Sequence, residues 1–267
     1  MTDRMIKDAA QVIDRVRQNV PLIQAVTNYV TINDCANILL AFGASPAMVE
    51  AREEAGDFAQ YAHAVYINLG TLTNEQEEAC VRAAAGAKKA GKPVVLDPAG
   101  CGAVPRKADV IAKIAALGRI DILKGNTGEI MVLAGLDAKV RGVDSMENEA
   151  GAEEAAGLLA KKYGCTVAAT GEVDVVTDGS RFVHVHNGVE LLTKITGAGC
   201  MAGALCAATA AVCEDMTVAA CAAMTAMGIA GERAYQKASL PGSFRVALMD
   251  AIYTVTGDTL KEMGEWA

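Results

Sequence analysis

The sequence contains few aromatic residues and little positive charge. Of its 267 residues only 4% are Phe, Trp or Tyr, and 24 Lys plus Arg stand against 32 Asp plus Glu, for a net charge of −8. Nucleic-acid binders need clustered positive charge to neutralise phosphates, so this class is excluded. Apolar residues still make up 52% of the chain, which excludes disorder and allows a large core.

Long apolar runs are also missing. The first twenty residues are charged and amphipathic, so we expect no secretory signal. The longest apolar run, residues 198–213, would span roughly 24 Å as a helix, which is short of a bilayer core. We therefore expect a buried helix there, no membrane partner and a cytoplasmic protein.

The eight cysteines include no C-x-x-C pair, and we expect free thiols that serve as small apolar side chains in a reducing compartment. Alanine and glycine are abundant instead: alanine is about a fifth of the chain, and there are 26 glycines. Such an interior favours closely packed helices and ligand sites lined by backbone over an aromatic β-sandwich core.

Short apolar runs alternate with helical stretches, which predicts one α/β domain over residues 1–267, a three-layer fold with a mostly parallel central sheet and helices on both faces. Asp178-Gly179 predicts a late antiparallel hairpin. The expected strands are 22–26, 47–49, 64–68, 93–96, 120–123, 166–169, 173–177 and 181–186. The expected helices are 34–42, 53–61, 74–90, 107–117, 199–213, 218–235 and a final one from 243.

The segment Thr196-Gly197-Ala198-Gly199-Cys200 opens the most apolar helix. Two glycines let the backbone turn, and the first turn of a helix leaves N–H groups unpaired, so this segment predicts an anion site for a phosphate. A tight turn into a buried helix is the plainer interpretation. A dinucleotide fingerprint fits less well, because Gly203 follows one residue too late and the motif lies far from the first strand.

Three predicted strands end in polar groups. Asp97 precedes a Pro/Gly loop, Lys124-Gly125-Asn126 leads to Glu129, and Thr170 precedes Gly171. Asp97 and Glu129 on neighbouring strand ends could hold Mg²⁺, although Asn126 and Glu129 also fit a capping box and Asp97 could cap a turn. At the N-terminal end, Asn28 follows the first strand and Met48 ends the second, where they could line a small pocket or, for Met48, pack in the core.

Together these motifs resemble the hydroxyethylthiazole kinases, which belong to the ribokinase-like superfamily. The resemblance rests on TNYVTINDCAN, GASPAM, LDPAGCGA, KGNTGEI, ATGEVD and TGAGC in this order, between residues 21 and about 242. It implies Mg²⁺-dependent transfer of the ATP γ-phosphoryl group to 4-methyl-5-(2-hydroxyethyl)thiazole in thiamine biosynthesis. It also implies a homotrimer with active sites at subunit interfaces.

The resemblance also implies roles for individual residues. Cys200 would lie where related kinases place a catalytic Asp, and it could act as a weak base with a lowered pKa or only shape the site. Departures from the family pattern are Lys124, where Arg is usual, and Ala99 to Cys101 in the loop after Asp97. The implied binding residues are Met48, Asn28 and Gly197 for the thiazole, Lys124, Thr170 and Asn126 for ATP, Asp97 and Glu129 for the metal, and Gly197, Ala198 and Gly199 for the anion hole.

Three alternatives remain open at this stage. One is a related small-alcohol kinase, such as a hydroxymethylpyrimidine kinase; the others are a dinucleotide-binding oxidoreductase and a non-catalytic nucleotide-binding regulator. His184 and His186 are expected to form a surface pair rather than a metal site. Trp266 could be a loose end or a subunit contact.

Overall fold

The computed structural model describes residues 2–118, 120–136 and 145–267. Within these residues eight strands form one sheet in the order β2-β1-β3-β4-β5-β6-β7-β8. All pairs from β2 to β6 are parallel, and β6–β7 and β7–β8 are antiparallel. The strands are β1 Leu22–Val26, β2 Ser45–Ala47, β3 Ala64–Asn68, β4 Val94–Asp97, β5 Ile122–Asn126, β6 Thr166–Thr170, β7 Asp174–Thr177 and β8 Phe182–Val185.

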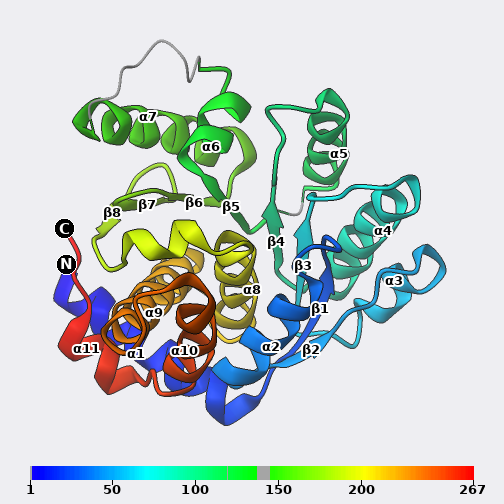
Figure 1. The fold of residues 1–267 in the computed structure, drawn as a ribbon. Helices are drawn as coiled ribbons and strands as arrows, with labels where there is room; N and C mark the ends of the chain where they lie inside the picture. The colour runs from blue at the N-terminus through cyan, green and yellow to red at the C-terminus, as the bar shows by residue number, and fades with distance from the viewer. Residues whose placement is uncertain (1, 119, 137–144) are drawn as a thin grey trace.

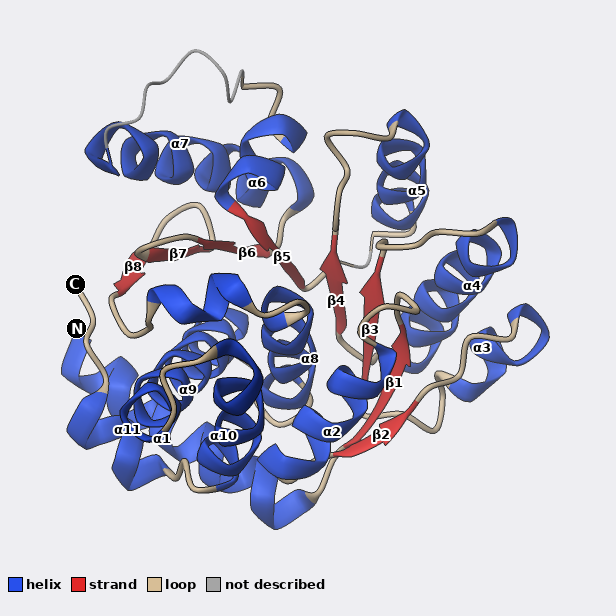
Figure 2. Ribbon diagram, in the orientation of Figure 1, coloured by secondary structure: helices blue, strands red, loops and turns tan. Residues whose placement is uncertain are grey.

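Helices cover both faces of the sheet, as expected, and bury two separate apolar clusters against it (Figures 1 and 2). One face carries α1 Thr2–Asn19, α2 Ile32–Phe42, α8 Ala198–Ala210, α9 Met216–Lys237, α10 Pro241–Tyr253 and α11 Gly257–Met263, with the 3-10 helix η1 Glu190–Lys194 beside them. The other carries α3 Arg52–Phe58, α4 Asn74–Ala90, α5 Pro105–Ala116, α6 Thr127–Leu133 and α7 Ser145–Tyr163.

The predicted hairpin is present between β7 and β8. The Asp178 carboxylate accepts hydrogen bonds from the backbone N–H groups of Ser180 and Arg181 at 2.9 and 2.8 Å. Gly179 has φ +87°, a value that glycine adopts without strain. These two residues therefore fix the turn that reverses the chain.

The second strand differs from the prediction, because it covers residues 45–47 and not 47–49. Pro46 interrupts the apolar run and was excluded from the expected strand. It is tolerated because β2 is an edge strand, where a missing N–H leaves no ladder partner unpaired. Met48 consequently follows the strand instead of ending it.

The end of the chain also differs, because two helices, α10 and α11, occupy the region where one was predicted. Arg17 of α1 donates hydrogen bonds to the carbonyl oxygens of Ile252 and Tyr253, at the end of α10, and of Val255, just after it. Thr256 then caps α11. Helices α1 and α7 fall where no helix was predicted.

The long apolar run forms a buried helix, as predicted. All residues of α8 from Met201 to Ala210 are buried between the sheet and the surrounding helices. Among the described residues, no helix has the length and hydropathy needed to cross a membrane.

Candidate active site

The N-terminus of α8 is built around a glycine that no other residue could replace without strain. Gly197, the N-cap, has φ +87°, and a Cβ atom there would lie 2.7 Å from Cγ2 of Thr31. No side chain caps this helix. Its first N–H groups are therefore available to an anion, and the helix dipole adds partial positive charge.

Lys124 places an ammonium group beside this helix end. Its side chain is buried in the middle of β5, and a Cβ atom on Gly199 would lie 3.1 Å from Nζ. Burial alone lowers the pKa of Lys124, but Asp97 and Glu129 more than offset this, and the pKa is raised. Lys124 therefore keeps its positive charge at the helix N-terminus, and Gly199 leaves room for it.

Asp97 ends β4 and lies in the same polar cluster. Burial raises its pKa to about 6, Lys124 acts in the opposite direction and Glu129 adds to the rise. Its Oδ2 accepts a hydrogen bond of 3.2 Å from the hydroxyl of Tyr66. A buried carboxylate with a second carboxylate nearby attracts a cation, because the cation offsets the repulsion between the two negative charges.

Glu129 forms the predicted capping box with Asn126. Glu129 Oε2 accepts from the N–H of Asn126 at 2.9 Å, and Asn126 Oδ1 accepts from the N–H of Glu129 at 2.8 Å. Glu129 Oε1 accepts from the N–H of Gly100, at 2.7 Å, in the loop after β4. The same carboxylate thus caps α6 and fixes the loop that follows Asp97.

Asp97 and Glu129 line the same cavity as the N-terminus of α8. Two carboxylates match the preference of Mg²⁺, which binds one or two carboxylates and completes its shell with water and substrate phosphates. The donor set of Asp97 and Glu129 fits this ion. No group of three or more His, Cys, Asp or Glu side chains among the described residues could enclose a metal alone. The arrangement therefore suits a metal that arrives with its substrate.

Cys200 lies in the first turn of α8. The side-chain amides of Asn28 and Asn68 both donate to its Sγ at 3.4 Å. Burial raises the pKa of this thiol, and Asp97 raises it further, while Thr31 and Lys124 act in the opposite direction. Burial of the thiol therefore argues against the low-pKa alternative for Cys200 and favours a role in shaping the site.

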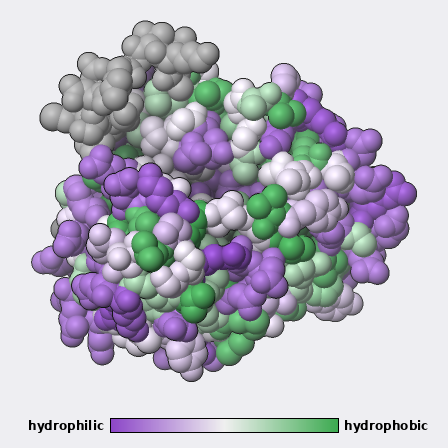
Figure 3. Space-filling model, viewed as in Figure 1, coloured by the Kyte–Doolittle hydropathy of each residue, from purple (hydrophilic) through white to green (hydrophobic). Residues whose placement is uncertain are grey.

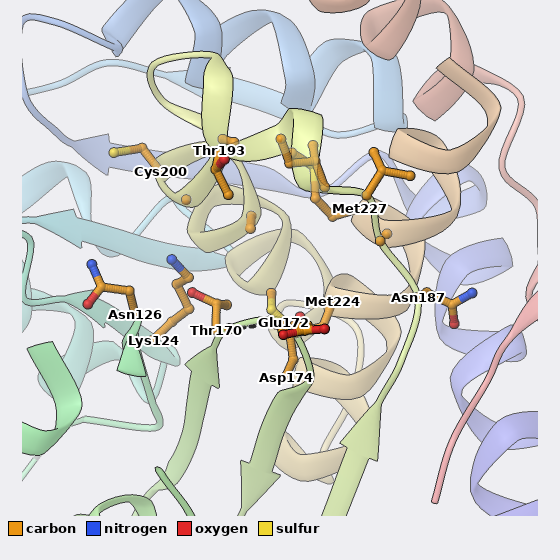
Figure 4. Close-up of a pocket in the computed structure, with 18 of the residues that line it drawn as sticks. Lys124, Asn126, Thr170, Glu172, Asp174, Asn187, Thr193, Cys200, Met224 and Met227 are labelled. Atoms are coloured by element: carbon orange, nitrogen blue, oxygen red, sulfur yellow. Dashed lines mark hydrogen bonds between the residues drawn. The ribbon is translucent and has the colours of Figure 1, made fainter. Parts of the chain in front are cut away.

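These groups open into a cavity of about 1110 Å³. Figure 4 shows Lys124 and Asn126 at one side and Met227 and Asn187 at the other. The space-filling view shows a hollow lined by hydrophilic residues near the centre of the molecule (Figure 3). Of the predicted site residues, those that line the cavity are Asp97, Lys124, Asn126, Glu129, Thr170, Gly197, Ala198, Gly199 and Cys200.

Asn28 and Met48 do not line this cavity. Asn28 still reaches the cluster through Cys200 and through a 2.9 Å hydrogen bond to Oδ1 of Asn68. Met48 is half-buried and packs against the apolar cluster of the α8 face. The structure therefore brings Asn28, but not Met48, of the residues predicted for the thiazole, into contact with Cys200 at the N-terminus of α8.

Several residues at the site were not predicted. Asn68 ends β3 and could have been found by the rule that identified the other strand ends, whereas Tyr66 lies inside the strand and gave no signal. The apolar end of the cavity is assembled from α9 and from the segment after β8, which the motifs do not mark. Its residues include Val189, Leu192, Ile195, Met224 and Met227.

The third glycine of the weak dinucleotide pattern has a packing role. A Cβ atom on Gly203 would lie 2.8 Å from the ring and the hydroxyl of Tyr66, in the middle of α8. The helix also follows η1 and not a strand. Both observations count against a dinucleotide-binding loop.

The structure also places the histidine pair, Trp266 and the cysteines that the sequence analysis singled out. His184 Nε2 lies 2.6 Å from Oε1 of Glu153, and His186 lines the cavity. Trp266 donates a 2.7 Å hydrogen bond from Nε1 to Oγ1 of Thr225 on α9 and pairs with Val185 of β8, so it is not a loose end. All eight cysteines carry free thiols, as predicted.

Comparison with known proteins agrees with this geometry. A hydroxyethylthiazole kinase 2 of Clostridium botulinum is 59% identical over 96% of this chain and 98% of that protein, and a hydroxyethylthiazole kinase of Clostridium kluyveri is 50% identical over 100% and 99%. The structure of a hydroxyethylthiazole kinase from Pyrococcus horikoshii OT3 superposes with a TM-score of 0.89, at 40% identity, over 98% of each chain.

A pyridoxal kinase of Staphylococcus aureus shares the fold alone, with a TM-score of 0.58 and 15% identity over 79% of this chain and 87% of that chain. This likeness agrees with the predicted ribokinase-like fold. The sequence model of the hydroxyethylthiazole kinase family matches residues 13–258. The chain belongs to the hydroxyethylthiazole kinase family.

Proposed function

We propose that this chain transfers the γ-phosphoryl group of ATP to the hydroxyl of 4-methyl-5-(2-hydroxyethyl)thiazole. Family membership supports the substrate, and one observation carries the chemistry: Lys124, Asp97 and the N-terminus of α8 meet in one buried cluster. A buried cation, a carboxylate and unpaired N–H groups are what phosphoryl transfer requires. The free thiols support a reducing, cytoplasmic setting for the reaction.

In the reaction, the substrate oxygen bonds to the γ-phosphorus, the bond from that phosphorus to the bridging oxygen of ADP breaks, and the hydroxyl proton passes to solvent water. The transition state is loose and carries its charge on the transferred oxygens, so positioning and neutralisation dominate. The N–H groups after Gly197 would meet these oxygens, and Lys124 would neutralise the phosphates.

Asp97 and Glu129 would hold Mg²⁺ beside the phosphates. When bound, the ion would neutralise phosphate charge and orient the polyphosphate. The carboxylates contribute the fixed part of the site: β4 ends at Asp97, and the capping box holds Glu129.

The cavity also suggests how ATP lies. Its polar side, with Lys124, Asn126 and Thr170, suits the phosphates, and its apolar side, with Met224 and Met227, suits a purine ring (Figure 4). Thr170 Oγ1 donates to the carbonyl of Gly125 at 3.3 Å, which holds the ends of β5 and β6 together under the proposed phosphates.

The thiazole would bind near Asn28, Gly197 and Met48, on the other side of the α8 N-terminus. Because Met48 lies outside the cavity, we propose that another subunit completes this pocket in a homotrimer. Large exposed apolar side chains on α2, on α10 and in the preceding loops support this assembly. They are Val30, Leu40, Leu240 and Val246, which are 58–71% exposed.

Cys200 would shape the site and would not act as its base. Its raised pKa leaves the thiol protonated near pH 7, and the loose transition state needs little help from a base. We expect Cys200→Ala to retain turnover within about tenfold of the parent. Turnover lost from this variant while ATP binding stays intact would refute the secondary role.

A coupled assay of ADP release across thiazole and pyrimidine alcohols tests the proposed function. We expect turnover with the hydroxyethylthiazole and none with hydroxymethylpyrimidine. Lys124→Met should lower kcat/KM at least a hundredfold, because it removes the cation at the phosphates. Lys261→Met, a surface variant on α11, is the matched control. Faster turnover of the pyrimidine would assign the chain to the related kinase class.

A further inference from the structure

Tyr66 is a buried phenol that the proposed reaction leaves without a role. It lies in the middle of β3 with 0% exposure, and its ring faces α8. Gly203 makes room for it, since any Cβ there would lie 2.8 Å from the ring and the hydroxyl. A glycine inside a helix is less favourable than alanine, so α8 accepts a destabilising residue at the position where the ring packs.

The hydroxyl of Tyr66 lies where the two halves of the site meet. It is 2.9 Å from the carbonyl oxygen of Cys200, in the first turn of α8, and 3.2 Å from Oδ2 of Asp97, at the end of β4. It also accepts a 3.0 Å hydrogen bond from Nδ2 of Asn68. One phenol thus joins the proposed metal carboxylate to the helix that carries the anion hole.

Asn68 extends this contact toward the proposed thiazole side. Its Oδ1 accepts from the side chain of Asn28 and from the N–H of Gly70, both at 2.9 Å. Asn28 in turn accepts at Oδ1 from the N–H groups of Val30 and Thr31. A continuous chain of hydrogen bonds therefore runs from the loop before α2, through Asn68 and Tyr66, to Asp97.

The phenol keeps its proton throughout the working pH range. Burial raises the pKa of Tyr66 well above 10, and the nearby Asp97 adds to the rise. With its single hydrogen it can donate either to Asp97 or to the Cys200 carbonyl, while Asn68 fills its acceptor side.

We propose that Tyr66 is a positioning residue, which orients the Asp97 carboxylate toward the metal and holds it in register with the N-terminus of α8. The inference rests on the proposed function, in which Asp97 binds the Mg²⁺ of the ATP complex. Partners that orient a metal ligand typically contribute 10–100-fold in metal affinity or activity.

Tyr66→Phe tests this role, because it removes the hydroxyl and keeps the ring. We expect the Mg²⁺ concentration for half-maximal rate to rise and kcat to fall 10–100-fold, with KM for the thiazole alcohol within about twofold of the parent. Calorimetry gives an independent readout: the gain in ADP affinity on adding Mg²⁺ should shrink, while ADP affinity in EDTA stays the same. Thr209→Val, which removes another buried hydroxyl from α8, is the matched control.

Gly203→Ala provides a second variant in case Tyr66→Phe does not fold. Its methyl group must displace the phenol from the same position, so it should reduce the Mg²⁺-dependent ADP affinity in the same direction. Unchanged Mg²⁺ half-saturation and an unchanged Mg²⁺ effect on ADP binding in either folded variant would overturn the proposal. If the parent turns over no thiazole alcohol, the proposed function fails, but the calorimetric comparison still decides the role of Tyr66.

Discussion

Adding a single methyl group at Gly197 should reduce both the stability and the activity of the protein. The φ of +87° at Gly197 and the 2.7 Å approach of a Cβ to Thr31 mean that Gly197→Ala strains the backbone and pushes α2 from the helix end. We expect a loss of about 1–3 kcal/mol in the free energy of unfolding and at least a tenfold fall in kcat/KM. Thermal unfolding and steady-state kinetics measure both.

Gly242→Ala is the control for this substitution. Gly242 lies in the first turn of α10, and a Cβ atom there meets nothing within 4 Å. This variant should keep its activity and its stability. Equal behaviour of the two variants would contradict the role given to the Gly197 turn.

Protonation of the Asp97 carboxylate should make the activity fall at low pH, as the acid limb of the pH–rate profile. The pKa of Asp97 is raised to about 6, mainly by burial, and the protonated form cannot bind a cation. We expect kcat/KM for ATP to fall about tenfold per pH unit below pH 6. Because the Tyr66 hydrogen bond lowers this pKa, Tyr66→Phe should move the limb to higher pH, which separates it from the ionisation of ATP itself. A limb at the same pH in both enzymes would contradict the assignment.

The same shift has a consequence for stability. A carboxyl group with a raised pKa binds its proton more tightly in the folded state, and Asp174 also has a pKa raised to about 6 by burial. The contribution of these groups to the free energy of unfolding therefore decreases as the pH rises from about 4 to about 6.

At the scale of secondary structure, Arg181 joins the late hairpin to α9. Its guanidinium donates to both carboxylate oxygens of Asp215, the N-cap of α9, at 2.7 and 3.0 Å, and to Asp178 at 2.7 Å. The pKa of Asp215 is lowered: burial raises it, but the bond from Arg181 and the N–H groups of α9 outweigh burial. A lowered pKa means that this stabilisation is present above about pH 4 and is lost as the pH falls further.

We expect Arg181→Met to lower the melting temperature at pH 7 by several degrees, and by less at pH 3, which lies below the unfolded-state pKa of the two carboxyl groups, so that part of their stabilisation is already lost. Lys261→Met, which breaks an exposed pair with Asp258, should shift it by about 1 °C or less. Scanning calorimetry at both pH values makes the comparison, and an equal loss at pH 3 would contradict the ion-pair explanation.

Helices and strands with a strong local signal were predicted well, and those set by distant contacts were not. The boundaries of α4 match, since Thr73 and Gln76 form a capping box and Gly91 ends the helix with positive φ. The division between α10 and α11 depends on Arg17, more than 230 residues away along the chain, and no local pattern reveals it. The second strand was predicted two residues too late, because Pro46 indicates the end of a strand unless that strand is known to lie at the edge of the sheet.

At the scale of the whole molecule, the proposed assembly makes a prediction of its own. Leu240, at the start of α10, is 71% exposed, and Leu240→Asp would place a charge in the proposed contact between subunits. We expect the parent to have three times the 27.6-kDa mass of the chain by light scattering, and the variant to dissociate and lose thiazole turnover. Leu158→Asp on α7, a face not proposed as a contact, should change neither. A monomeric parent with full activity would refute the trimer.

In the candidate site, too, residues in local motifs were predicted and residues placed by tertiary contacts were not. Groups at strand ends and at the α8 N-terminus were found from the sequence, because parallel strands bring their carboxyl ends to one edge. Tyr66 and Met227 were not found, because each becomes part of the site only when a distant helix packs over the sheet. The polar residues of the site can therefore be found from local sequence motifs, whereas the residues that support them depend on tertiary packing.

The position of α1 has a consequence for the order of folding. This helix precedes the sheet along the chain, yet its Arg17 and Asp14 bind residues at the end of α10 and the start of α11. A helix gains most of its stability from the surface it packs against, and contacts between distant segments form slowly. The sheet can form strand by strand from β1 as the chain is synthesised. The residues that α1 packs against, however, lie in the last quarter of the chain, so α1 can dock only after they are present. Its amide hydrogens should therefore gain protection from exchange late in refolding, together with those of α11.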